Sequence, residues 1–374
     1  MWRANRIRIE KSGYQGSTEC FTMSATLMDT DSPPGSPPSH ESATLPSPSP
    51  FSTQKQSSSS RESAFSPLAQ IFVGSDGPYA GTRWLIYLAF LAFAFLALSV
   101  FDSLLAGLYA HLDRSLWWKM SQELGMMLAA IVPAFLMARL EGCRFGDFGL
   151  PAKKAFGRNF WVGALWGFGS LSVLLLFLRI VGAFSFGDLA QHGPHILKLA
   201  FFWAVFFLIA AFFEDFLLRG YSQWVLSRGM NFWPAASVLS CLFGVIHLRN
   251  PGETYIGIAG VIAIGLFFCL TLWRTGTLWW AIGFHMAWDW GESFLYSVPD
   301  SGSMVPGHLL NSSLNGPDWL TGGSVGPEGS YLVFALLAVL WILFSRAYPE
   351  VKYGAPEGSP SPQPPNFQPT NFQG

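Results

Sequence analysis

The sequence predicts an all-α protein: a polytopic transmembrane bundle of about eight helices with disordered N- and C-terminal tails. The 374 residues are 51% hydrophobic and only 12% charged, whereas about 25% charged residues is typical of soluble domains. From residue 84 onward, apolar runs recur, and each is near the ~20 residues that a helix needs to cross a bilayer. The two ends of the chain are instead polar and rich in Ser and Pro.

Residues 1–82 are predicted to be a disordered cytoplasmic tail. The tract from 24 to 70 is dominated by Ser and Pro and has too few apolar side chains to offset the entropy of ordering it. The beginning of the chain lacks the pattern of a signal peptide. Met23 and Met28 are alternative translation starts, because residues 1–22 have no evident relation to the rest of the chain. Residues 347–374 are expected to form a second, Pro-rich disordered tail.

The segment between the tails, residues 83–346, is predicted to be one membrane-embedded domain. The fifth of its eight apolar runs is short for a crossing and the fourth is long. The runs lie at 84–108, 116–138, 160–182, 197–226, 233–248, 256–273, 277–296 and 331–346. Gly163 and Gly167, together with the glycines of 257–265, are expected to let helices approach closely.

Basic residues near the ends of the runs predict the orientation, because they favour the cytoplasmic side. The loop between the second and third runs is rich in them, whereas the next loop, 182–195, has none. This pattern predicts that both termini are cytoplasmic and that the loop 297–330 lies outside; in a bacterium the membrane would be the plasma (inner) membrane. The basic residues on the predicted inner side are Arg139, Arg144, Lys153, Lys154, Arg158, Arg228, Arg274, Arg346 and Lys352.

Three ionisable residues lie close together in the interior of the fourth run: Glu214, Asp215 and Arg219. Each costs about 2.5 to 3.5 kcal/mol at bilayer depth on insertion scales, so a group of three indicates a compensating structure or a function. Asp215 and Arg219 are four residues apart and share a helix face, while Glu214 is turned by about 100°. We expect a structural Asp215–Arg219 pair and a Glu214 free for chemistry. The alternatives are one ion-pair network of all three residues, or a helix at the membrane interface.

Two later runs add histidines. Phe243 and His247 are four residues apart in the fifth run, and His285 and Asp289 have the same spacing in the seventh. A His and an acid one turn apart either bind one metal ion or form a pair in which the acid orients the imidazole. Purely structural roles, a packed histidine and a His–Asp hydrogen bond, remain open for each.

The depths of these residues are similar. Counted from the predicted cytoplasmic ends of their helices, Glu214, His247 and His285 fall within about 10 Å of one another in height, at 1.5 Å per residue. Together with Asp289 they offer the nitrogen and oxygen ligands of a zinc hydrolase, with a carboxylate able to accept a proton from water. The HExxH pattern of soluble zinc proteases is absent, so three helices would share the task.

These residues resemble the signature of the CPBP intramembrane proteases, a group of CAAX proteases and bacteriocin-processing enzymes that includes Abi, CAAX prenyl protease 2-like and lysostaphin resistance protein A-like members. The signature is EExxxR, FxxxH and HxxxN or HxxxD on successive helices. The matching stretches are "EDFLLR" (214–219), "FGVIH" (243–247) and "HMAWD" (285–289).

The resemblance covers residues 84–346. It implies a membrane metalloendopeptidase: Glu214 activates a water, and His247 and His285 bind the metal or hold the water. The expected cofactor is a divalent metal, zinc, with Glu214, His247, His285 and Asp289 as its ligand set. Asp215, Arg219 and Phe243 would support the site.

Two positions depart from the signature. Asp215 replaces the second Glu and still reaches Arg219. Asp289 stands where the best-understood members have an Asn that acts as an oxyanion donor, and an ionised Asp cannot donate a hydrogen bond. Asp289 is therefore a metal ligand, the role we favour, a protonated donor, or a sign of altered activity.

Two other functions fit the composition. An ion- or proton-coupled transporter also places acids, histidines and an arginine inside a bundle, and a catalytically inactive scaffold would keep the same fold. Besides membrane lipid, the expected partner is a peptide or lipidated protein substrate of unknown identity. The net charge of -1 does not suggest nucleic acid as a partner.

Overall fold

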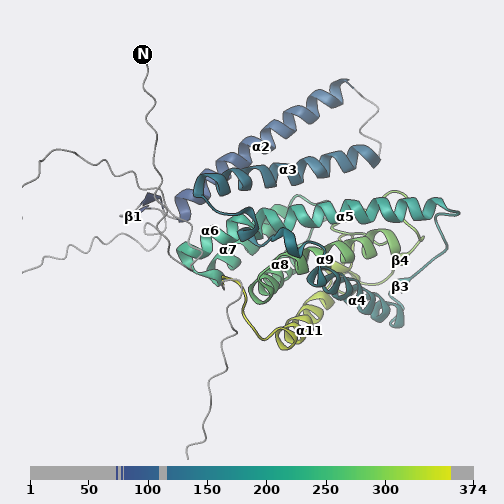
Figure 1. The fold of residues 1–374 in the computed structure, drawn as a ribbon. Coiled ribbons are helices and arrows are strands. Elements are labelled where there is room, and N and C mark those ends of the chain that lie inside the picture. Colours follow the sequence, from purple (N-terminus) through teal and green to yellow (C-terminus); the bar gives the residue numbers. More distant parts are fainter. Residues whose placement is uncertain (1–72, 75–76, 79, 109–115, 355–374) are drawn as a thin grey trace, which may run out of the picture.

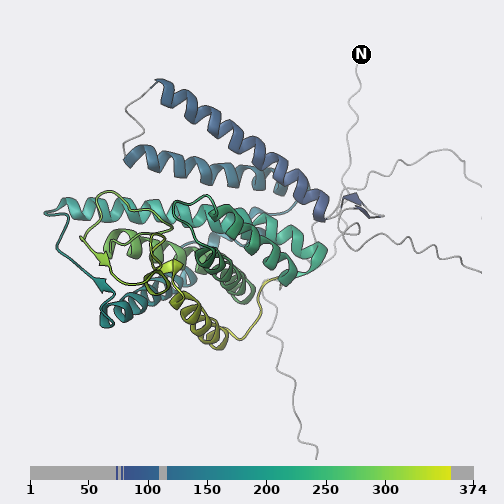
Figure 2. The same ribbon diagram turned by 180° about the vertical axis from the view of Figure 1, so that it is seen from behind.

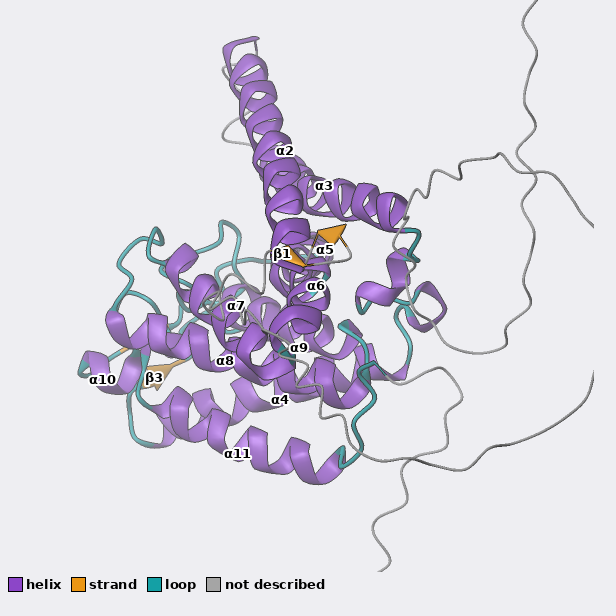
Figure 3. Cartoon of the chain, turned by 90° about the vertical axis from the view of Figure 1, so that its left-hand side faces the viewer, coloured by secondary structure: helices purple, strands orange, loops and turns teal. Residues whose placement is uncertain are grey.

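The computed structural model describes residues 73–74, 77–78, 80–108 and 116–354. Helices make up nearly all of its regular structure, as Figure 3 shows, and the predicted all-α class is confirmed. The long elements are α2 (Ala80–Leu108), α3 (Leu116–Glu141), α4 (Arg158–Ile180), α5 (His195–Arg219), α6 (Tyr221–Met230), α7 (Phe232–His247), α8 (Tyr255–Thr275), α9 (Trp279–Asp289) and α11 (Leu332–Ala347).

Short elements connect these helices. The 3₁₀ turns are η2 (Phe145–Phe148), η3 (Ala152–Lys154) and η5 (Pro327–Gly329); η4 (Trp290–Leu295) is a π-helix that continues α9, and α10 spans Asp318–Thr321. Two antiparallel strand pairs are present, β1 (Val73–Gly74) with β2 (Gly77–Pro78) and β3 (Phe184–Ser185) with β4 (Ser313–Leu314).

Each of the eight predicted runs coincides with a helix. Within the described residues, five stretches are long and apolar enough to cross a membrane, judged by length and composition: Ala80–Leu105, Leu116–Glu141, Arg158–Ile180, His195–Met230 and Tyr255–Thr275. The long fourth run is divided into α5 and α6 at Gly220, where the backbone leaves helical geometry (φ −79°, ψ −115°). The fifth run is short, as its sequence indicates: α7 has 16 residues.

Helix α5 lies between two layers (Figure 1). On one side are α2 and α3, which approach each other at one end and diverge at the other; on the other side are α4, α8, α9 and α11, and Figure 2 shows the same arrangement from behind. At the convergent end, Glu141 of α3 accepts hydrogen bonds from Arg83 of α2 and from the Tyr221 hydroxyl of α6. This cluster joins the α2–α3 pair to the rest of the bundle.

Glycines bring the backbones of α4 and α9 into contact. A Cβ atom added to Gly163 would lie 2.0 Å from the Trp280 carbonyl oxygen, and one added to Gly167 would lie 2.1 Å from the Phe284 carbonyl oxygen. Gly283 faces the Phe160 carbonyl in the same way, at 2.1 Å. The close approach expected from these small residues is therefore present, and it places α4 directly behind the helix that carries His285.

The connections gather at two opposite ends. We call residues 142–157, 220–231, 274–278 and 347–353 the basic end, because most of the basic residues of the predicted inner side lie there. Leu278 donates its backbone N–H to Gly149 O at 2.8 Å, and Lys352 donates to Trp273 O at 3.1 Å. Residues 181–194, 248–254 and 296–331 form the loop end, where Ala190 donates to Leu309 O at 2.8 Å.

Only small parts of the predicted tails lie within the described residues. The low-complexity tract, Met23, Met28 and the chain from residue 355 onward lie outside them. Residues 348–353, which the sequence places in the disordered C-terminal tail, pack onto α7 and α8. The Tyr353 ring contacts the rings of Phe232 and Trp273, with centroids 4.8 and 6.2 Å away.

Candidate active site

His285 stands at the centre of the polar residues in the bundle. Its Nε2 atom lies 3.7 Å from Glu214 Oε2 and 3.5 Å from Asp289 Oδ2, and its Nδ1 atom lies 3.6 Å from Asp215 Oδ2. Two helices supply these groups, α5 and α9. The backbone contact of Gly167 with Phe284, the neighbour of His285, holds α9 at this position.

The predicted pair of Asp215 and Arg219 is present and buried. Arg219 Nη1 donates to Asp215 Oδ1 at 2.7 Å, and the side chains are 2% and 0% exposed for Arg219 and Asp215. The second oxygen of Asp215 has no hydrogen-bond partner among the described residues and faces His285. The acid expected to be only structural therefore also contacts the imidazole.

Aromatic rings hold the guanidinium of Arg219. It lies 4.7 Å from the ring centroid of Phe243 and 5.3 Å from that of Phe268, distances at which a cation is attracted to a ring face. Arg219 Nε also donates to Gly265 O at 3.3 Å. Phe243 thus contacts Arg219, whereas nothing in the motif pattern indicated Phe268.

Glu214 is the more accessible acid of the pair on α5. Its side chain is 32% exposed, against 0% for Asp215, because consecutive helical residues are rotated by about 100° and so face different environments. Glu123 of α3 lies within electrostatic range of Glu214. Sequence reasoning missed Glu123, because only Lys119 accompanies it as a charged residue in its run and no motif surrounds it.

His247 is not brought into this group. Its Nδ1 atom is 2.9 Å from the Phe243 carbonyl oxygen, and its ring packs on that of Phe243. Among the described residues, no acid lies within ion-pair distance of His247; its charge acts at longer range on Asp300. The structure therefore assembles Glu214, Asp215 and Asp289 around the imidazole of His285, with His247 apart.

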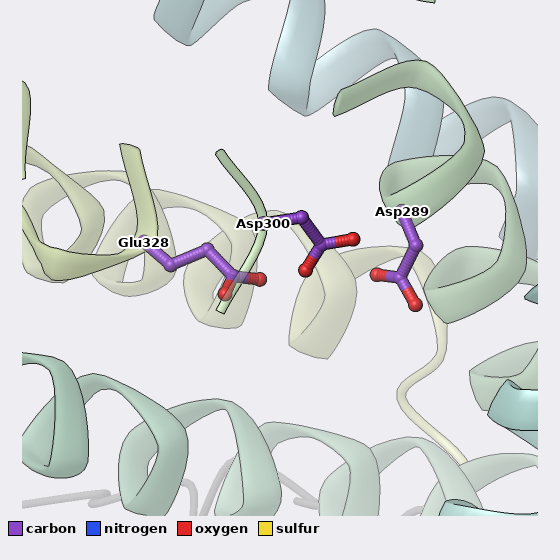
Figure 4. Close-up of side chains that lie close together, drawn as sticks. All are labelled: Asp289, Asp300 and Glu328. Atoms are coloured by element: carbon purple, nitrogen blue, oxygen red, sulfur yellow. The ribbon is translucent and has the colours of Figure 1, made fainter. Parts of the chain in front are cut away.

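The loop end adds acids that the sequence did not indicate. Asp300 and Glu328 approach Asp289, and one oxygen of each of the three lies within 4.8 Å of those of the other two. Figure 4 shows the Asp300 carboxyl between those of Glu328 and Asp289. Ser293 and Ser301 hydroxyls donate to Asp300 at 2.7 Å and Glu328 at 3.1 Å.

Burial changes the protonation of these loop acids. Burial raises the pKa of Asp300 to about 6, because removing a carboxylate from water disfavours its charged form. Burial and then the charge of Asp300 raise the pKa of Glu328 to about 8. Neither acid behaves as an exposed carboxylate.

The predicted zinc ligands fit a tetrahedral zinc site only in part. Two ligands of one tetrahedral zinc lie about 3.3 Å apart, given metal–ligand bonds near 2.0 to 2.1 Å, so the 3.5 and 3.7 Å separations around His285 Nε2 suit each pair singly. Glu214, His285 and Asp289 do not, however, place three donor atoms within 4.8 Å of one another; in the described part of the chain, only Asp289, Asp300 and Glu328 do so.

A small cavity of about 50 Å³ adjoins His285, Asp289 and Glu328, which is room for about one or two water molecules. A larger cavity of about 400 Å³ lies at the basic end near Phe135 and Arg139, and the described residues that line it include none of the acids or histidines above. The larger cavity therefore does not adjoin the polar cluster around His285.

One segment of the chain is similar to a known protein family. Residues 196–291 match the family model described as "Type II CAAX prenyl endopeptidase Rce1-like". The matched range begins in α5, ends just after α9 and contains all three motifs. This segment is Rce1-like.

The Rce1-like match confirms the resemblance drawn from the motifs. At the level of the family it supports a CAAX-type intramembrane protease, and with the five candidate spans it supports an integral membrane protein in a lipid bilayer. The Rce1-like segment covers the helices that carry Glu214, His247 and His285, but not α2, α3, α4 or α11. No curated protein and no solved structure matches the chain.

Proposed function

We propose that this chain is an intramembrane endopeptidase that hydrolyses a peptide bond with a water activated by Glu214. The observation that carries the proposal is the contact between Glu214 and His285, supported from behind by Asp215 and Arg219. A partly exposed carboxylate beside an imidazole, inside a bundle that matches a protease family over these helices, is the arrangement required for general base catalysis.

Glu214 serves as the general base. A water about 2.8 Å from both Glu214 Oε2 and His285 Nε2 can sit beside this pair, whose atoms are 3.7 Å apart. The carboxylate takes a proton from that water while the water oxygen attacks the carbonyl carbon of the scissile peptide bond. The same carboxyl then gives the proton to the departing amine when the carbon–nitrogen bond breaks.

Asp215 is the positioning residue for His285. Arg219 holds one oxygen of Asp215, and the other faces His285 Nδ1 at 3.6 Å. A carboxylate beside Nδ1 favours the tautomer with the proton on Nδ1 and fixes the orientation of the ring, so that Nε2 points away from the carboxylate. His285 Nε2 is then left to contact the water.

A zinc ion remains part of the proposal, with Glu214, His247, His285 and Asp289 as the predicted ligands. Bound zinc lowers the pKa of water and polarises a carbonyl. Of this set, Glu214 and Asp289 lie beside the imidazole of His285, and His247 lies apart from them. Asp289 keeps its favoured role as a carboxylate ligand.

We further propose that the basic end faces the cytoplasm, so that the substrate is a membrane-anchored peptide or lipidated protein reached from that side. Lys153→Cys at the basic end and Asp188→Cys at the loop end are both solvent-exposed positions. In sealed vesicles of known orientation, an impermeant thiol reagent added on the cytoplasmic side should label only the first. Labelling of only the second would reverse the orientation.

The catalytic proposal is tested with Glu214→Gln. The purified wild-type chain, reconstituted in liposomes, is assayed on prenylated and unprenylated membrane-anchored peptides. Loss of the base should lower turnover by about 10²- to 10⁴-fold with unchanged helical content. Glu350→Gln, an exposed acid near the C-terminal end of the described chain, should leave turnover at the wild-type value. Full turnover by Glu214→Gln would end the proposal.

A further inference from the structure

Three carboxyl groups meet at the loop end although they come from three separate segments. Asp289 ends α9, Asp300 lies in the following loop, and Glu328 lies in η5 (Figure 4). We propose that Asp289, Asp300 and Glu328 bind a hard divalent cation of the calcium or magnesium type, at a site that adjoins the Glu214–His285 pair through Asp289.

The geometry suits one ion. One oxygen from each side chain lies within 4.8 Å of the other two. Oxygen ligands bind Ca²⁺ at 2.3–2.6 Å, so two ligands of the same ion are at most about 5 Å apart. An all-carboxylate donor set without sulfur or imidazole selects hard cations over zinc or copper.

A fourth carboxyl group points to the same place independently. Glu292 is completely buried, and its Oε2 atom accepts a hydrogen bond from Trp288 Nε1 at 2.6 Å. Its Oε1 atom has no hydrogen-bond partner among the described residues and faces the segment that carries Glu328, since a Cβ atom added to Gly326 would lie 3.4 Å from it. The acids that act on Glu292 electrostatically are Glu328, Asp300 and Asp289.

The four acids also lack a basic side chain as a partner. Within the described ranges, no lysine or arginine lies within ion-pair distance of these four acids, and their one ion pair joins Asp289 to His285. Buried charges are paired or coordinate metals, because a buried carboxylate without a partner is costly. A divalent cation would replace the protons that burial favours on Asp300 and Glu328, and it would use the free oxygen of Glu292, directly or through a water.

Cation binding would join the loop end to the active-site helix. Asp300 and Glu328 both lie in the 296–331 segment, whereas Asp289 is one helical turn from His285. An ion shared by these segments stabilises the folded chain by mass action, since the unfolded chain lacks the site. Asp289 is thereby held at a fixed place relative to His285.

Terbium luminescence tests the proposal on the full chain in detergent. Tb³⁺ replaces Ca²⁺ at oxygen sites and emits when a nearby indole transfers excitation to it, and Trp288 lines the cavity with Asp289 and Glu328. We expect saturable Tb³⁺ emission that Ca²⁺ displaces. Asp300→Asn and Glu328→Gln should each weaken Tb³⁺ binding at least tenfold, and Asp188→Asn, which removes an exposed acid of the same end, should leave it unchanged.

Further variants separate the outcomes. Trp288→Phe removes both the sensitising indole and the hydrogen bond to Glu292, so it should reduce the emission and weaken the stabilisation by Ca²⁺ together. Glu214→Gln should keep the terbium affinity of the wild type, so a failed protease proposal would leave this site standing. The proposal is overturned if Tb³⁺ does not saturate and Ca²⁺ leaves the melting temperature unchanged, or if Asp300→Asn and Glu328→Gln bind like the Asp188→Asn control.

Discussion

Arg219 Nη1 donates to Asp215 Oδ1 at 2.7 Å in a region where the two side chains are only 2% and 0% exposed. Removing one partner from such a pair leaves an uncompensated buried charge, whereas replacing both is far less costly. The pair therefore has two consequences: it stabilises the meeting of α5 with α7 and α8, and it gives Asp215 a fixed position behind His285.

Arg219→Met should destabilise the chain by about 3 to 5 kcal/mol, because Asp215 is left without its cation. The double variant Asp215→Asn with Arg219→Met should lose clearly less. Thermal or denaturant unfolding in detergent measures both, and Arg179→Met, at an exposed position near the end of α4, serves as the control. Equal losses in the single and double variants would contradict a coupled pair.

Gly167→Ala should lower both the melting temperature and the turnover. The added methyl group meets the Phe284 carbonyl oxygen at 2.1 Å, so α4 and α9 must separate, and overpacking of this kind costs about 1 to 3 kcal/mol. Gly169→Ala is the matched control on the same helix, because its new Cβ would have nothing within 4 Å. Equal effects of the two substitutions would show that the contact does not position His285.

Asp289→Asn separates the possible roles of that residue. If the carboxylate is a ligand, as we propose, turnover falls by more than the about 10- to 100-fold that loss of a hydrogen-bond partner of a ligand causes; an amide that acts as an oxyanion donor would instead keep or raise turnover. Peptide cleavage by the reconstituted chain decides between them. Activity at or above the wild-type value would exclude a necessary carboxylate at this position.

Metal removal should abolish turnover if zinc is the cofactor. A zinc-selective chelator should inactivate the reconstituted enzyme, and added Zn²⁺ should restore it, because zinc lowers the pKa of bound water. The non-chelating isomer of the same compound controls for direct inhibition. Full activity after dialysis to a metal content far below one ion per chain would reject the zinc proposal.

The helices and the first polar contacts were predictable from local patterns. Apolar runs of membrane length indicated all eight helical segments, and the spacing of four residues placed Asp215 beside Arg219 and His285 beside Asp289. Small residues at Gly163 and Gly167 indicated the close crossing of α4. Each of these inferences depends only on residues within one helix.

Contacts between distant segments were not predictable in this way. A similar depth in the membrane did not bring His247 to His285, because depth does not determine the direction in which a side chain leaves its helix. Asp300 and Glu328 lie in a loop rich in Gly, Ser and Pro, where periodicity gives no signal. The contact of Asp215 with His285 likewise depends on how α5 packs against α9.

The segment 296–331 limits access to His285 from the loop end. It is tied to residues 184–190 by the β3–β4 pairing and the hydrogen bond from Ala190 to Leu309, and it sets two acids against the end of α9. A polypeptide that approached His285 from the loop end would first have to break the β3–β4 pairing. The proposed peptide substrate would therefore reach His285 from a side of the bundle other than this segment.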